Sequence, residues 1–264
     1  MTRPALGTYA RIAASSARQS IAQRTTLVGR CALYVLILVV FSRIWRTVGG
    51  DAAAGGPGAK EMLWYLAVTE WIVIALPLTH LAIEADVRSG DIAYHLARPV
   101  PYVGVRLAEA AGDLSVRLVS LGVTGVVAAL LLAGGLPEDP RGLVLALPLG
   151  VLAGAVGVLF HAAIGLSSFW LQDAGAVYFV WQKLMFVLGG MILPLAVYPA
   201  WLRAVAEWTP FAAMLSGPGR LAFAPDLGVA ATSAALLVLW LAVAAALLAF
   251  LHRRGARVLD VNGG

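Results

Sequence analysis

Long apolar segments recur along this chain and constrain its fold more than any other feature of the sequence. Six of them lie at about 27–47, 62–83, 113–134, 143–169, 176–198 and 227–251. Each is close to the ~20 residues that an α-helix needs to cross the ~30 Å hydrocarbon core of a bilayer. Lipid offers no hydrogen bonds, so a spanning segment must satisfy its own backbone groups, as a helix does. The sequence therefore predicts an all-α, polytopic membrane protein with six transmembrane helices in a single domain.

The amino-acid composition argues against a soluble domain. Only 12% of the 264 residues are charged, and 61% are hydrophobic. A soluble domain carries about a quarter of its residues as charged side chains. The net charge of +5 is a feature of many nucleic-acid-binding proteins, but in a chain this apolar we interpret it as arginines placed at the cytoplasmic lipid surface. We therefore expect membrane lipids, and no nucleic acid, as partners.

The lysine and arginine residues between the apolar segments indicate the orientation. Four arginines precede residue 27, three lie in 84–111, and three follow residue 251. The opposite connections hold Lys60, Arg141, Arg203 and Arg220, with Arg46 at the edge of the first span. Cytoplasmic connections carry the excess of these residues. Both termini and residues 84–111 are therefore predicted to be cytoplasmic.

Residues 9–25 precede the first apolar segment and are too polar to cross a membrane. At helical spacing their apolar side chains share one side and their polar side chains the other. The apolar set is Tyr9, Ile12, Ala13, Ala17 and Ile21, and the polar set is Arg11, Ser15, Arg18 and Gln19. This pattern predicts a helix lying along the membrane surface. The alternative is a frayed polar tail.

Residues 84–111 form a polar connection after the second span. Ser89 or Asp91 can cap a short helix by accepting from free backbone N–H groups, and Pro99 ends it, because the residue before a proline avoids helical geometry. The side chains this helix can expose are Ile92, Tyr94, His95 and Leu96. A short rigid helix of this kind suits docking into a groove on a soluble partner. The alternative is an ordinary interfacial loop.

Glycine and proline residues interrupt the region from the fifth span to the sixth. Gly190, Pro194, Pro199 and Pro210 lie there. Proline breaks a helix, and irregular backbone persists at membrane depth only where protein or water covers it. We expect a broken, partly re-entrant element at about 199–222 on the outer side. The alternative is an exposed loop with a surface helix.

Two charged residues, Glu70 and Lys183, lie inside predicted spans. A charge at membrane depth costs a few kcal/mol, so it usually faces the bundle interior or a partner. Glu70 and Lys183 are candidates for the polar lining of a translocation path or for an ion pair. The alternative is that each reaches water or a lipid headgroup.

Several catalytic and ligand-binding motifs are absent from the sequence. It contains no Gly-x-x-x-x-Gly-Lys-Ser/Thr loop, so this chain has no ATP site of its own. The four histidines are scattered, and none has another histidine or a carboxylate at the spacing typical of metal ligands. His80 and His161 are interpreted as packing residues. We predict no catalytic residues, no metal and no cofactor.

The order of the two interrupted regions resembles a known family. The stretch Gly90-Asp-Ile followed by Leu96-Ala-Arg-Pro-Val100, and later the series of Gly190 and prolines, resemble permeases of the ABC-2 type, in particular those of bacterial drug and natural-product exporters. The resemblance covers nearly the whole chain. It departs where many relatives have Gly followed by Thr or Ser and this chain has Ser-Gly-Asp-Ile.

The resemblance implies roles for the two regions. The first would form the coupling helix that receives movement from an ATPase, with Gly90, Asp91, Ile92, Leu96, Arg98 and Pro99 as coupling residues. The second would cap the outer end of the path, with Gly190, Pro194, Pro199 and Pro210 as the outer gate. The chain would then be the permease subunit of an ATP-binding cassette exporter in a bacterial inner membrane, working with two ATPase subunits and a second permease, identical or homologous.

Two other classes of function stay open from the sequence alone. An ATP-independent carrier often has breaks in matching positions of two halves, and here only the fifth span has an obvious break, with Pro77 in the second span as a weaker one. A membrane-embedded enzyme needs catalytic groups converging at one depth. Copurification of an ATPase favours the exporter, whereas activity or flux from the isolated chain favours the other two.

Overall fold

The computed structural model describes residues 6–48, 58–96, 100–171, 173–191 and 193–262. Among these residues there are helices and turns but no strands. The helices are α1 (Leu6–Ala22), α2 (Arg24–Val48), α3 (Ala59–Ala75), α4 (Thr79–Ser89), α5 (Asp91–Leu96), α6 (Tyr102–Ala133), α7 (Arg141–Leu166), α8 (Gly175–Leu188), α9 (Ala200–Glu207), α10 (Pro210–Met214), α11 (Ser216–Leu221) and α12 (Leu227–Asn262). Two 3₁₀ turns are η1 (Ser167–Phe169) and η2 (Leu195–Val197).

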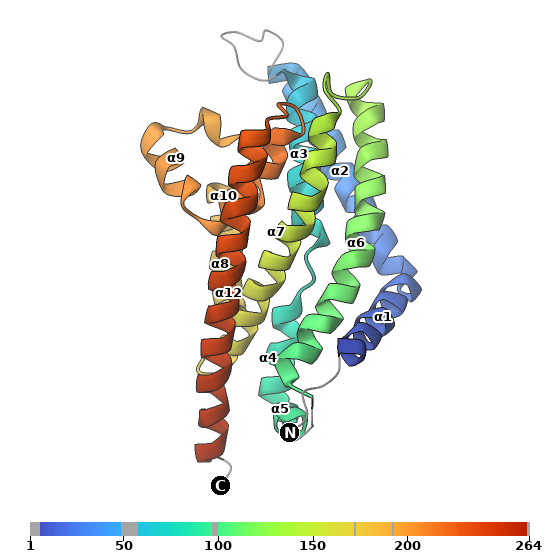
Figure 1. Ribbon diagram of the computed structural model, residues 1–264. Coiled ribbons are helices and arrows are strands. Elements are labelled where there is room, and N and C mark those ends of the chain that lie inside the picture. Colours follow the sequence, from blue (N-terminus) through green and yellow to red (C-terminus); the bar gives the residue numbers. More distant parts are fainter. Residues whose placement is uncertain (1–5, 49–57, 97–99, 172, 192, 263–264) are drawn as a thin grey trace.

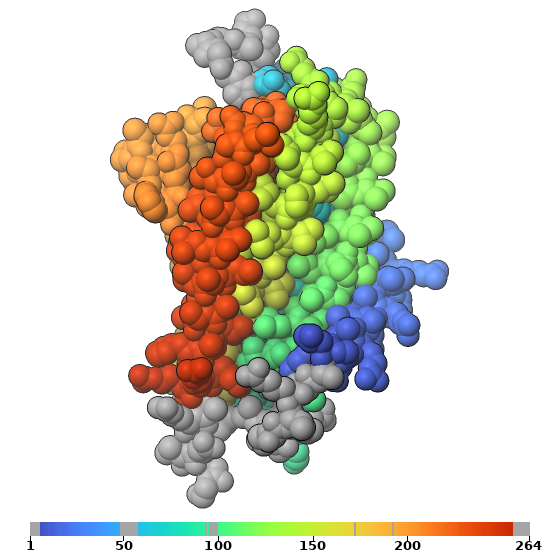
Figure 2. Space-filling model, viewed as in Figure 1, coloured from blue at the N-terminus to red at the C-terminus, as the bar shows by residue number. Residues whose placement is uncertain are grey.

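The long helices run side by side in one bundle (Figure 1). At one end, here named the α5 end, lie α5 and the C-terminal part of α12, with α1 against the flank nearby. At the opposite end, the α9 end, lie α9 and the turn between α6 and α7. The space-filling view shows α12 along one side of the bundle and α9 projecting from it (Figure 2).

Five segments in the described part of the chain are long and apolar enough to cross a membrane. They are Arg24–Thr47, Ala59–Ser89, Tyr102–Ala133, Arg141–Phe169 and Leu227–Gly255. These helices confirm the predicted all-α membrane class. The predicted count of six is not confirmed, because α8 has only 14 residues, about 21 Å at 1.5 Å per residue. Gly189 and Gly190 end it well before the expected boundary at 198.

Helix α3 forms the centre of the bundle and is packed against α2, α6, α7 and α11. Its side chains Trp64, Tyr65, Leu66 and Ile72 are almost fully buried. Small residues on the neighbours allow this close packing, as is common between membrane helices. A Cβ atom added to Gly150 of α7 would lie 2.2 Å from the ring of Trp71.

Helix α1 lies directly against α6. A Cβ atom at Gly112 would lie 2.1 Å from the carbonyl oxygen of Ala13. The hydroxyl of Ser16 donates to the carbonyl oxygen of Glu109 at 2.7 Å, and that of Ser20 donates to the Asp113 carboxylate at 2.8 Å. The helix predicted for 9–25 is thus held against α6 by the small residues on one of its faces.

Helix α6 begins at Tyr102, eleven residues before the expected start of the third span. The sequence analysis assigned 84–111 to a polar connection because of its charged residues. In the structure Arg106 pairs with Asp86 and Glu109, and Asp113 pairs with Arg117. Because these charges satisfy one another, α6 continues through the polar region as a regular helix.

Candidate functional site

The connection between α4 and α6 is a compact corner at the α5 end of the bundle. Gly90 ends α4 in the left-handed conformation, with φ of 80°, which glycine adopts at low cost. The hydroxyl of Ser89 donates to the Asp91 carboxylate at 2.9 Å and accepts from the backbone N–H of Asp91 at 3.3 Å. The two residues predicted to cap the short helix therefore form one turn together, and α5 follows directly from it.

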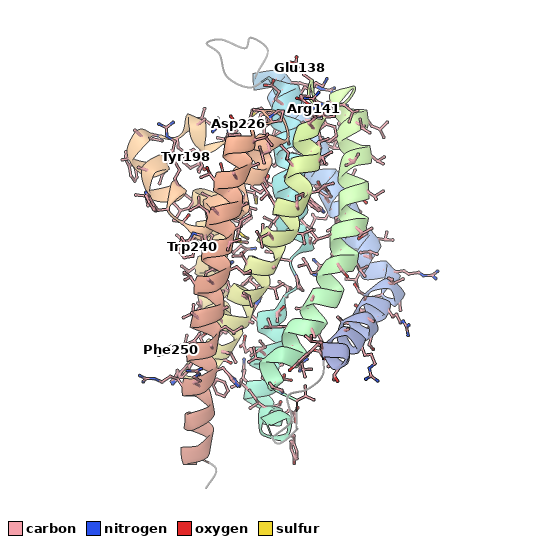
Figure 3. All side chains as sticks on the ribbon, in the orientation of Figure 1. Glu138, Arg141, Tyr198, Asp226, Trp240 and Phe250 are labelled. Carbon is pink, nitrogen blue, oxygen red and sulfur yellow. The ribbon has the colours of Figure 1, made fainter. Side chains whose placement is uncertain are left out.

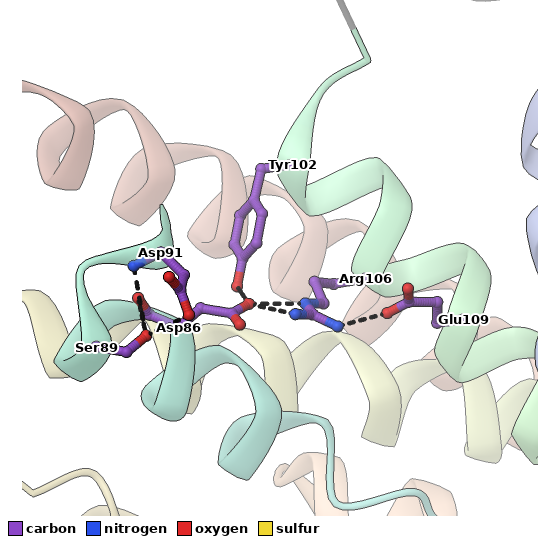
Figure 4. Close-up of polar contacts among 6 residues, drawn as sticks. All are labelled: Asp86, Ser89, Asp91, Tyr102, Arg106 and Glu109. Carbon is purple, nitrogen blue, oxygen red and sulfur yellow. Dashed lines mark hydrogen bonds and ion pairs between the residues drawn. The ribbon is translucent and has the colours of Figure 1, made fainter. Parts of the chain in front are cut away.

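A network centred on Asp86 joins α4 to α6 (Figure 4). The Asp86 carboxylate accepts from the Tyr102 hydroxyl at 2.5 Å and from Arg106 Nε at 2.9 Å. Arg106 also donates to Glu109 at 2.7 Å. The side chains of Asp86 and Arg106 are only 13% and 19% exposed, so little water competes for these bonds. The sequence analysis did not identify this network, because it treated these residues as part of a solvated connection.

The position of Ile92 contradicts its expected exposure. Its side chain is 1% exposed and belongs to a cluster of buried residues with Ile83, Tyr102 and Leu248. A helix as short as α5 has one narrow apolar face, and here the bundle covers it. Tyr94, by contrast, is 76% exposed, and Asp91 is exposed as well. Among the other predicted coupling residues, the side chain of Leu96 and all of Arg98 and Pro99 lie outside the described residues.

The structure does not bring Glu70 and Lys183 together. Glu70 is buried within α3, and its side chain forms no hydrogen bond or ion pair with the described residues. Lys183 is exposed on α8, with its Nζ atom 4.9 Å from the ring centre of Phe179 and 5.7 Å from that of Phe186. These contacts with ring faces stabilise an ammonium group without a carboxylate.

An apolar cavity of about 620 Å³ is bounded by α3, α6 and α7. Its walls include Trp71, Gly122 and Val151, and neither Glu70 nor Lys183 lines it. Among the described residues no group of three His, Cys, Asp or Glu side chains could hold a metal ion.

The region after α8 folds as a series of short turns held by α3. Gly190 has φ of 63°, in the region that favours glycine. Its carbonyl oxygen accepts from the Tyr65 hydroxyl, and that of Met191 accepts from Thr69 Oγ1 at 3.0 Å. Side chains of α3 thus cover irregular backbone that lipid could not satisfy.

The three prolines predicted for the outer gate each precede or begin an element. Pro194 comes directly before η2, Pro199 directly before α9, and Pro210 is the first residue of α10. The first position of a helix accepts proline, because its N–H has no partner within the helix. The region therefore consists of short helices α9, α10 and α11, with α9 farthest from the bundle (Figure 1).

The second membrane segment is broken between α3 and α4, where Pro77 interrupts the helix. Three side chains from other helices satisfy the freed carbonyl oxygens. Arg30 Nη1 donates to Ile74 at 3.2 Å, Arg117 Nη1 donates to Leu76 at 3.1 Å, and His161 Nδ1 lies 2.9 Å from the Pro77 oxygen. The sequence indicated a weak break at Pro77 but not these partners. Arg30 and Arg117 inside apolar segments were the signal that could have found them.

A family model decides the class of this protein. The model described as ABC-2 type transporter matches residues 10–218. The chain belongs to this family. The predicted resemblance is thereby confirmed.

Membership defines the chain in general terms. An ABC-2 family protein of this kind is the transmembrane component of an ABC transporter, and it has no ATP site of its own. A comparison with curated proteins found no match. The corner at the α5 end, the turns held by α3 and the break at Pro77 are therefore interpreted from their geometry in this ABC-2 protein.

Proposed function

We propose that this chain is the permease subunit of an ATP-binding cassette exporter that is driven by a separate ATPase. Two ATPase subunits bind at the α5 end, and a second permease, identical or homologous, completes the translocation path. The α5 end faces the cytoplasm of a bacterial cell, with both termini on that side. The family match carries this proposal, and the distribution of arginines supports the orientation.

The corner between α4 and α6 has the properties of a coupling element. Tyr94 and Asp91 present an exposed surface on α5. The buried side chain of Ile92 packs the same helix against the bundle, and the Asp86 network links α4 to α6. A force applied to α5 is then transmitted to two membrane helices. In this proposal Gly90, Asp91, Ile92, Leu96, Arg98 and Pro99 are the coupling residues.

The second membrane segment connects this corner with the outer gate. Its cytoplasmic half, α4, carries Asp86, and its outer half, α3, holds Gly190 and Met191 through Tyr65 and Thr69. The break at Pro77 lies between the two halves, and in this proposal it is the hinge at which their relative angle changes during transport. Movement of α5 thereby reaches Gly190, Pro194, Pro199 and Pro210. Glu70 and Lys183 are proposed to become part of the path when the gate opens.

The first experiment is to coexpress the chain with an ATP-binding subunit encoded near it and to purify the tagged permease. We expect the ATPase to copurify and its ATP hydrolysis to increase when both are reconstituted in liposomes. Purification of the permease alone, with flux of a solute that does not depend on ATP, would contradict the proposal and favour a carrier.

Substitution of Tyr94 tests where the ATPase docks. We expect Tyr94→Asp to reduce copurification of the ATPase at least tenfold, because a buried charge at an interface without a partner costs several kcal/mol. Tyr94→Phe keeps the ring and should bind normally. Ile92→Asp is unsuitable, because it places a charge in the core of the chain itself. Equal copurification with Tyr94→Asp and Tyr94→Phe would place the docking site elsewhere.

A further inference from the structure

Four buried polar atoms without a hydrogen-bond partner belong to residues at the break between α3 and α4. They are Arg30 Nε, Thr79 Oγ1, His80 Nδ1 and His161 Nε2. Only one other side-chain atom in the described part of the chain shares this property, Nε1 of Trp181. Buried polar atoms nearly always have hydrogen-bond partners, because a buried donor or acceptor without a partner costs about 1–3 kcal/mol. Their concentration at one place points to a ligand.

Ring contacts fix the arrangement of this cluster across three helices. The ring of His80 on α4 stacks on Tyr178 of α8, with centroids 3.9 Å apart. The His161 ring on α7 lies 5.4 Å from His80 and 5.3 Å from Tyr178. His161 contacts the break through the carbonyl oxygen of Pro77. Arg30, on α2, contacts it through the carbonyl oxygen of Ile74. The unpartnered atoms therefore surround the start of α4.

The charge at this place is positive. Arg117 is neutralised by Asp113, at 2.5 Å, whereas no carboxylate pairs with Arg30 among the described residues. Helix α4 starts here, and Leu78 before it provides no side-chain cap. Among its first N–H groups, that of Leu81 donates to the Leu78 carbonyl oxygen at 3.1 Å, which leaves those of Thr79 and His80 without a partner in the helix and with a partial positive charge. Thr79, the first residue of α4, is only 6% exposed and adds a hydroxyl that can donate.

We propose that the break binds an anionic phosphate group, held by Arg30, Thr79 and the backbone N–H groups of Thr79 and His80. The His80 and His161 rings lie at its side, with water between the phosphate and Nε2 of His161, which is an acceptor when Nδ1 donates to Pro77. Water alone would satisfy the hydroxyl and the ring nitrogens but would leave the charge of Arg30 uncompensated. A phosphate supplies several acceptor oxygens and the missing negative charge at once.

The position of the break suits a group that arrives from the inner surface of the membrane. Arg30 lies six residues after the start of α2, about 9 Å along the helix. Leu78 in the break is 40% exposed, and Arg30 is partly exposed, so the break reaches the surface of the bundle. The 620 Å³ cavity is not lined by break residues.

Binding can be measured on the purified full chain in detergent by native mass spectrometry. The probes are phosphatidylglycerol and phosphatidylcholine with the same acyl chains, and inorganic phosphate against chloride in a thermal unfolding assay. Wild type should retain phosphatidylglycerol over phosphatidylcholine or be stabilised by phosphate. Arg30→Gln should weaken the effect about tenfold, since a hydrogen bond to a charged group is lost. Arg43→Gln, an exposed arginine on the same helix, is the matched control.

The outcomes separate the sources of the phosphate. Preference for phosphatidylglycerol that Arg30→Gln weakens about tenfold and Arg43→Gln keeps identifies a lipid headgroup. Stabilisation by inorganic phosphate without lipid preference identifies a free ion. Absence of both effects in wild type, or equal losses in the two variants, overturns the proposal. If Arg30→Gln does not fold, the isosteric Thr79→Val is expected to weaken binding severalfold. Neither result depends on the ATPase, so the proposed transport function stands or fails separately.

Discussion

Single glycines determine how closely the helices of this bundle approach, and Gly112 is the clearest case. We expect Gly112→Ala to destabilise the protein by about 1–3 kcal/mol, because the added methyl overlaps the backbone of α1. Gly29 of α2 has nothing within 4 Å of an added Cβ, so Gly29→Ala should be neutral or stabilise by up to about 1 kcal/mol through helix propensity. In thermal unfolding in detergent, Gly112→Ala should lower the Tm, whereas Gly29→Ala should leave it unchanged or raise it. Equal shifts would show that α1 is not held in this contact.

The candidate residues chosen from the sequence have surroundings that the sequence does not show. Gly90 and Gly190 were chosen from their motifs, and both adopt the left-handed conformation. Ile92 was expected to be exposed, because its place on a short polar connection says nothing about which side faces the bundle. For Lys183, sequence spacing could not separate an ion pair from its actual contacts with Phe179 and Phe186, which lie on its own helix.

At the scale of elements, the contact between α4 and α6 depends on Asp86 and Arg106. We expect Asp86→Asn and Arg106→Gln each to destabilise the protein, and their coupling energy in a double-mutant cycle to be about 1–3 kcal/mol. The measurement is chemical or thermal unfolding of the four proteins. In contrast, Arg88 is 65% exposed and 3.4 Å from Glu84, so Arg88→Gln should change stability by less than about 0.5 kcal/mol. A coupling energy near zero would mean that the Asp86–Arg106 pair does not hold α4 to α6, and that apolar contacts such as that of Ile83 with Tyr102 do so.

The same contact explains which elements the sequence could predict. Segments such as α2 and α7 follow their hydrophobic lengths and match closely. The polar start of α6 was not predicted as helix, because its charged residues pair with α4 and such tertiary contacts cannot be read from composition. The break at Pro77 depends likewise on Arg30, Arg117 and His161 from three other helices. The shortening of α8 follows from Gly189 and Gly190, whose effect on a span depends on the turns that α3 then stabilises.

For the whole molecule, the decisive question is whether the short α8 and the turns after it together complete a sixth crossing. Asp173 precedes α8, and Asp226 follows α11; Figure 3 shows Asp226 at the same end as Glu138 and Arg141. The chain has one native cysteine, Cys31, so a Cys31→Ser background accepts single cysteines at Asp173, Asp226, Glu138 and Ser89, all exposed. In intact cells a membrane-impermeant maleimide should label the cysteines at 138 and 226. Those at 89 and 173 should react only after permeabilisation.

The pair at 173 and 226 carries the test, and Cys31→Ser without further changes is the control for background labelling. Because α7 and α12 both run the full length of the bundle, the residues between them must pass from the α5 end to the α9 end once (Figure 1). About 21 Å of α8 covers most of a ~30 Å core, and the turns from Gly189 onward, held by Tyr65 and Thr69, cover the remainder. If the cysteine at 226, like that at 173, reacts only after permeabilisation, residues 174–226 do not cross the membrane, and the five remaining crossings leave the C-terminal end of α12 outside the cell.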